Sequence, residues 1–137
     1  ALQLNIFDAV TFHGYASTRQ KVRLMNESGL FIFASRQEGF GLVLLEAMAA
    51  GLPIVARKLP VYEDFFIQGE HGRLVSNQDP ERLADATVEL LEDEQKMIDI
   101  QSTNTQAAQN FSWTTSVKRT EAVLSDVTND NNKRYKV

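Results

Sequence analysis

Two glutamates and the glycine-containing loop between them are the residues most able to do chemistry. Glu38 lies in the polar segment 35–41, and Glu46 follows after seven intervening residues, inside an apolar stretch. Gly39 and Gly41 leave backbone amides uncovered, and a helix that begins after them adds free N–H groups and a partial positive charge. Such a site suits a phosphate. The alternative interpretation is a tight turn in which the two glycines only provide positive φ angles.

Glu46 is the one polar residue of the segment 42–50. Little of such a helix can face water, and a buried carboxylate without partners is strongly unfavourable. We therefore expect Glu46 to reach a cleft, a cation or hydroxyl donors. A ligand with its phosphates on the helix N-terminus would place its sugar hydroxyls near this carboxylate, and Glu38 could accept hydrogen bonds from a bound sugar. The alternative is that Glu46 lies on a narrow exposed edge and pairs with an arginine.

The elements that must position these residues alternate between strands and helices. Apolar or β-branched runs predict strands at 10–12, 30–34, 53–56 and 73–75, and the run 30–34 suits a strand buried on both faces. Caps and helical periodicity predict helices at 17–28, 42–50, 60–67, 80–91, 94–110 and 113–127. This alternation predicts an α/β fold, with a Rossmann-like parallel sheet and flanking helices. We expect one domain over residues 1–127 and a flexible tail at 128–137.

The composition excludes several classes of protein. The chain has 137 residues, of which 43% are hydrophobic and 23% charged, as in soluble globular domains. Its net charge of −4 argues against nucleic acid as a partner, and no apolar run reaches the ~18 residues of a membrane segment. Cysteine is absent, which fits a reducing compartment. No histidine or third carboxylate lies near the glutamate pair in sequence, so we predict no metal site.

The segment 38–56, EGFGLVLLEAMAAGLPIVA, resembles the E-x7-E signature of retaining GT-B glycosyltransferases, chiefly family 4. The similarity extends upstream to VTFHG at 10–14 and downstream through GEHGRLV at 69–75, and it covers residues 8 to 125. The resemblance implies a Rossmann-like nucleotide-sugar-binding domain. This chain would be the later part of the C-terminal domain.

The resemblance also implies a role for each site residue. Glu38 would be the catalytic residue that holds donor-sugar hydroxyls beside the reacting centre, and Glu46 would accept hydrogen bonds from the ribose. The backbone amides would line the sugar at Gly39, Phe40 and Gly41 and contact the diphosphate at Leu42 and Val43. The strand end around 10–12 would flank the base. The donor would be a UDP- or GDP-linked sugar, with no cofactor beside it and no metal.

For the whole protein, the resemblance implies hexose transfer, with retention of configuration, to a glycan, lipid or protein acceptor. The acceptor-binding N-terminal domain and the donor-phosphate Arg and Lys would precede Ala1, so the isolated chain is expected to be inactive. We expect a cytoplasmic protein, in which any contact with a membrane face is made by the missing N-terminal half.

The segment 57–64 departs from the family pattern, which often has a glycine-rich turn at this point. We expect Arg57 and Lys58 to be a solvated pair; the alternative is that they supply positive charge on the donor side. We also expect a solvated His71 and a Trp113 that anchors the last helix by packing.

Two other functions remain open. A non-catalytic scaffold module would keep this fold, although the intact glutamate pair disfavours it. A receiver-like module would need acidic residues grouped at strand ends, and the acidic residues here are not grouped in that way.

Overall fold

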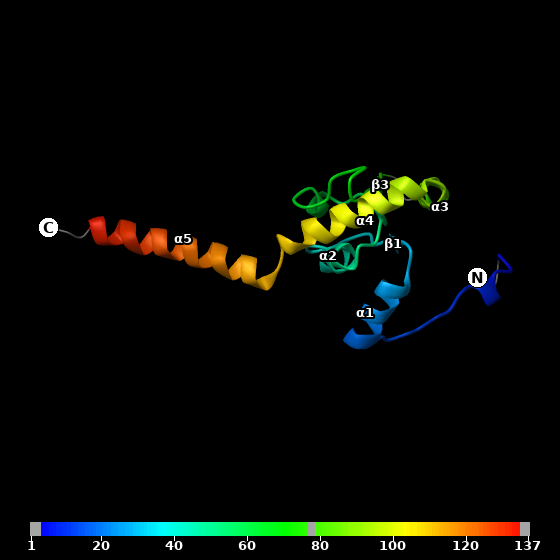
Figure 1. Cartoon of the computed structure of the whole chain (residues 1–137), viewed down its shortest axis with the longest axis horizontal. Coiled ribbons are helices and arrows are strands. Elements are labelled where there is room, and N and C mark those ends of the chain that lie inside the picture. The colour runs from blue at the N-terminus through cyan, green and yellow to red at the C-terminus, as the bar shows by residue number, and fades with distance from the viewer. Residues whose placement is uncertain (1–3, 77–78, 135–137) are drawn as a thin grey trace.

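A parallel three-stranded sheet forms the centre of the molecule (Figure 1). The computed structural model describes residues 4–76 and 79–134, with side chains up to residue 128. The strands are β1 (Phe31–Phe33), β2 (Ile54–Arg57) and β3 (Gly72–Val75), in the order β1-β2-β3. All pairs are parallel, with Phe31 opposite Ile54 and Ile54 opposite Gly72. The predicted α/β class and parallel sheet are confirmed.

The helices lie close to the predicted ranges, except that the segment 60–67, predicted as a helix, forms only a 3-10 turn at Pro60–Tyr62. They are α1 (Thr18–Glu27), α2 (Leu42–Ala49), α3 (Pro80–Leu91), α4 (Glu94–Gln109) and α5 (Trp113–Arg134), with single 3-10 turns at Phe7–Ala9 and Pro60–Tyr62. Ser17 caps α1 in a capping box with Gln20, and Asp79 caps α3, whose first residue is Pro80. Gly51, with a φ of 77°, follows Ala50, the C-cap of α2, and takes the left-handed conformation with which glycine often ends a helix.

The alternation of side chains along β2 divides the core into two clusters. Ile54 and Ala56 face a cluster with α2 and the aromatic residues of the 60–66 segment. Val55 faces a second cluster with Leu90 of α3 and Ile100 of α4. β2 is the middle strand, and the edge strand β1 beside it ends at Phe33, from which the loop leads to α2.

The turn that leads into β3 is covered by α4, which contradicts the prediction of a solvated His71. His71 is 3% exposed, and its carbonyl oxygen accepts a hydrogen bond from Asn104 Nδ2 at 3.1 Å. The same Nδ2 donates to the Leu52 carbonyl oxygen at 2.7 Å. Burial lowers the pKa of His71 below its ordinary value, against smaller opposing contributions from Asn104 and Glu70. Asn104 thus joins α4 to the chain on either side of β2.

The N-terminal segment differs from its prediction. Residues 10–12 form no strand; Val10 and Phe12 are exposed and pair with no strand among the described residues. The strand β1 is half-exposed rather than buried on both faces, because it is an edge strand and Ile32 points to solvent. On α1, Val22 is exposed, whereas Met25 is buried.

The last helix, α5, is longer and less packed than predicted. It continues past Val127 to Arg134 because residues 113–134 contain no glycine or proline, so part of the predicted flexible tail is helical. Residues 135–137 lie outside the described residues. Trp113 is 88% exposed and does not anchor the helix by packing. Figure 1 shows α5 projecting away from the sheet. In the described part of the chain, no helix is both long and apolar enough to span a membrane.

Candidate functional site

The loop between β1 and α2 places backbone amides at the carboxyl end of the sheet. Gly41 is the residue that precedes α2, and its φ of 89° lies in the left-handed region that favours glycine. A Cβ on Gly41 would lie 2.6 Å from Tyr62 Cε1, so the loop needs glycine here both for conformation and for space. The first amides of α2 receive no side-chain cap, and they follow directly at Leu42 and Val43.

Gly39 behaves differently from Gly41. Its φ is not positive, and a Cβ on it would have no neighbour within 4 Å. The alternative interpretation of the loop, a turn in which both glycines provide positive φ, is therefore correct for Gly41 and wrong for Gly39. The space around Gly39 is open to a ligand.

Glu38 is half-buried in this loop, close to the Tyr62 ring. Burial, and secondarily the charge of Glu38, raise the pKa of Tyr62 to about 12. Phe40 packs on Phe65, with ring centroids 5.4 Å apart, and this contact holds the loop against the core. Glu38 is therefore presented by a loop fixed at Gly41 and Phe40.

Glu46 lies on α2, one turn beyond the loop, and it is not buried. Its side chain is 43% exposed, and Oε1 lies 2.6 Å from Nζ of Lys21 on α1. The expectation that little of α2 faces water was wrong, since Leu42, Glu46 and Ala49 form an exposed stripe along the helix. The alternative interpretation, an exposed edge with a cationic partner, was correct in kind, although the partner is lysine rather than arginine.

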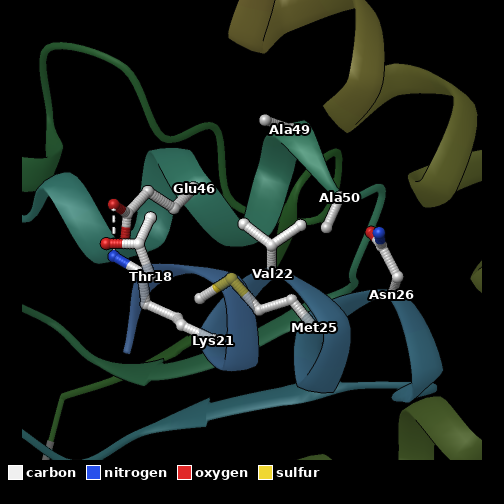
Figure 2. A pocket seen from close by; sticks show the side chains of 8 residues that line it. All are labelled: Thr18, Lys21, Val22, Met25, Asn26, Glu46, Ala49 and Ala50. Carbon is white, nitrogen blue, oxygen red and sulfur yellow. Dashed lines mark hydrogen bonds and ion pairs between the residues drawn. The ribbon is translucent and has the colours of Figure 1, made fainter. Parts of the chain in front are cut away.

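Glu46 nevertheless lines two hollows. One, of about 260 Å³, lies between α1 and α2 and also contacts Lys21, Val22 and Met25 (Figure 2). The other, of about 570 Å³, lies between α2 and the start of α5 and includes Phe40 and Leu42. Glu38 lines neither of these two hollows. The second hollow thus brings together Glu46, Phe40 and Leu42. Glu38 lies outside it, two residues before Phe40 in the loop.

Arg57 is a residue whose placement sequence reasoning missed. It ends β2, and its Nε and Nη1 atoms are buried with no hydrogen-bond partner among the described residues. Lys58 is exposed, so the two do not form the predicted solvated pair. The sequence did carry a signal for this burial, because Arg57 directly follows the buried apolar run 54–56. A residue at the end of such a strand can be covered by the loop that follows it.

Carboxylates and histidines do not gather elsewhere in a way that suggests a metal. Within residues 4–76 and 79–134, no group of three such side chains is close enough together to hold an ion. The charged groups that the loop and the hollow between α1 and α2 bring to the site include the two glutamates and the Lys21 ammonium, beside the backbone amides of the loop.

A parallel α/β sheet with an uncapped helix N-terminus at its carboxyl edge is the arrangement in which open α/β folds bind phosphate-containing ligands. Residues 1–109 match the family glycosyl transferases group 1, and the chain belongs to that family.

Known relatives agree with this assignment. The D-inositol 3-phosphate glycosyltransferase of Corynebacterium urealyticum is 34% identical over 119 residues, which are 87% of this chain and 28% of that protein. The structure of Anabaena HepE in complex with UDP-glucose superposes with a TM-score of 0.81 at 29% identity, covering 91% of this chain and 34% of that one. Sucrose-phosphate synthase from Thermosynechococcus elongatus gives a TM-score of 0.80 at 26% identity, covering 94% and 33%. The chain therefore spans about a third of the length of these proteins.

Proposed function

We propose that this chain is the donor-binding part of a retaining glycosyltransferase of family 4, which transfers a hexose from a UDP- or GDP-linked sugar. The observation that carries the proposal is the loop 35–41, which presents open amides at a helix N-terminus between two glutamates. HepE was solved with UDP-glucose, which supports a nucleoside-diphosphate hexose as the donor.

The diphosphate would bind at the N-terminus of α2. The amides of Leu42 and Val43 are free of intrahelical and side-chain partners there, and the helix dipole favours a negative charge. Gly39 allows close approach, because no atom occupies the space beside its Cα. The sugar would then lie along the amides of Gly39, Phe40 and Gly41.

The two glutamates would bind hydroxyls on either side of the diphosphate. Glu46 lines a hollow one helical turn from the phosphate position, where the ribose of the nucleotide would lie. Glu38 precedes the open amides and would hold hydroxyls of the donor sugar. A carboxylate that accepts from hydroxyls forms charge-assisted hydrogen bonds, which are the stronger kind.

The transfer itself would proceed by attack of the acceptor on the same face from which the diphosphate departs. The departing diphosphate would assist by accepting the acceptor's proton, so neither glutamate would serve as a covalent nucleophile. Catalysis would rest on positioning and on stabilisation of the leaving charge by the α2 amides. The acceptor, a glycan, lipid or protein, would be bound by a further domain, and the isolated chain would be inactive.

Donor binding and turnover of the full-length protein test this proposal. We expect Glu46→Ala to weaken binding of UDP or GDP in calorimetry, and Glu38→Ala mainly to lower turnover with the corresponding sugar nucleotide. Glu92→Ala is the matched control, because Glu92 is an exposed glutamate at the end of α3. Folded protein that binds neither nucleotide would favour a non-catalytic scaffold, and unchanged rates in both site variants would refute the assigned roles.

A further inference from the structure

Lys21 is the charged residue of the hollow between α1 and α2 to which the proposed donor site gives no role. Its Nζ donates to Glu46 Oε1 at 2.6 Å, and this contact joins two helices across 25 residues of sequence. Figure 2 shows the two charged groups meeting at one end of the hollow, with Asn26 at the other. The pair therefore lies at one end of the hollow that Glu46 lines.

The ion pair is a weak contributor to stability. The two side chains are 37% and 43% exposed, and exposed pairs typically stabilise a protein by about 1 kcal/mol or less. Holding a lysine in one geometry also costs side-chain entropy. Stability of the fold is thus a poor account of this pair, and its position in the hollow points to a ligand.

The hydrogen-bonding capacity of the pair fits two neighbouring hydroxyls. An ammonium donates three hydrogen bonds and a carboxylate accepts about four, and the contact between Lys21 and Glu46 uses one of each. One hydroxyl of a sugar diol can donate to the free carboxylate oxygen while the oxygen of the other accepts from Nζ. A lone carboxylate would satisfy only the donors of such a diol.

The hollow itself fits one sugar ring. Its volume of about 260 Å³ lies below the ~300–1,000 Å³ of sites that enclose whole small molecules. Val22 and Met25 of α1 and Ala49 of α2 give it apolar walls, which suit the carbon face of a ring.

We propose that Lys21 and Glu46 together bind the vicinal diol of the nucleotide ribose. In this pair Lys21 is a positioning residue for the Glu46 carboxylate and also a specificity-determining donor to the second hydroxyl. The proposal rests on the proposed function, which places the ribose at Glu46, and it adds discrimination between ribonucleotides and 2′-deoxyribonucleotides.

The test compares UDP and GDP with their 2′-deoxy counterparts on the full-length protein by calorimetry. The variants are Lys21→Met, Lys21→Arg, Glu46→Gln and the control Arg23→Met. Arg23 lies on the same helix, outside the hollow, and pairs with Glu27 at 3.8 Å. Circular dichroism of each variant verifies folding.

We expect Lys21→Met to weaken ribonucleotide binding about tenfold, since hydrogen bonds to charged groups are worth this much, and to weaken 2′-deoxy binding much less. Lys21→Arg should restore most of the discrimination, and Arg23→Met should leave both affinities unchanged.

Three outcomes contradict the proposal in distinguishable ways. If Glu46→Gln abolishes discrimination but Lys21→Met preserves it, Lys21 has no role and the proposed function stands. If both variants behave as wild type, the ribose does not lie at Glu46, and both the role of Glu46 and the present proposal fall. If folded wild-type protein binds none of the four nucleotides, the proposed function fails, and the role of Lys21 fails with it.

Discussion

The helices α2 and α5 both carry apolar side chains, but α2 is apolar at every position except Glu46 whereas α5 is mostly polar, and only α2 is part of the core. Leu44, Ala47 and Met48 of α2 have no exposed surface, because the helix packs against both β2 and α4. The apolar side chains of α5, including Val123 and Leu124, are exposed along a helix that projects from the body (Figure 1). The difference shows that an apolar side chain stabilises the fold only where a neighbouring element covers it.

The largest effect is expected from a cavity in α2. Leu44→Ala should lower the free energy of unfolding by about 2–5 kcal/mol, because the side chain is fully buried and its neighbours can only partly close the space. Chemical denaturation of the purified protein measures this change. The matched control is Leu42→Ala on the same helix, where the leucine is 67% exposed and the loss should be small. Equal losses at the two positions would contradict the assigned packing of α2.

A somewhat smaller effect is expected where α4 is joined to the chain beside β2. Asn104→Ala removes both hydrogen bonds from Nδ2 and leaves the carbonyl oxygen of Leu52 without this partner in a buried site. Each unsatisfied buried group costs about 1–3 kcal/mol, so the free energy of unfolding should fall by about the same amount. Asn110→Ala, at the exposed end of α4, is the control. Amide hydrogen exchange near Leu52 should accelerate in the first variant only; unchanged exchange would contradict the role of Asn104.

The buried imidazole of His71 should make stability depend on pH. Burial lowers the pKa of His71 in the folded state below the 6.5 of an ordinary histidine, so the unfolded chain binds the proton more tightly. Its contribution to stability is therefore complete above pH 6.5 and is lost as the pH falls towards the folded-state pKa. The free energy of unfolding, measured from pH 7 to pH 5, should fall more steeply in wild type than in His71→Gln. Parallel curves for the two proteins would contradict this expectation.

Much of the fold was predictable because its signals are local. Ser17 and Asp79 mark helix starts by their capping chemistry, Gly51 marks a helix end, and the β2 run is apolar because both of its faces are covered. The loop 35–41 with its open amides was predictable for the same reason.

Other features depend on contacts that no local pattern encodes. The sequence predicted that Glu46 reaches a cleft, a cation or hydroxyl donors, but no local pattern identifies the cation, because Lys21 lies 25 residues away in the sequence. His71 looks like a turn residue, and only the packing of α4 over the turn buries it. The predicted strand at 10–12 has β-branched and aromatic residues, yet a strand also needs a partner.

The smallest effect is expected from α5. Leu124→Ala should change the free energy of unfolding by less than about 0.5 kcal/mol, as surface substitutions usually do, because the side chain is exposed and makes no contribution to either core cluster. Denaturation of the full-length protein under the conditions used for Leu44→Ala measures the difference directly. A loss above about 1 kcal/mol would contradict the expectation, since it would mean that the apolar residues of α5 are covered in the folded protein. In that case α5 would stabilise the fold as α2 does, by packing against a neighbouring element. The two helices would then differ only in which element covers them.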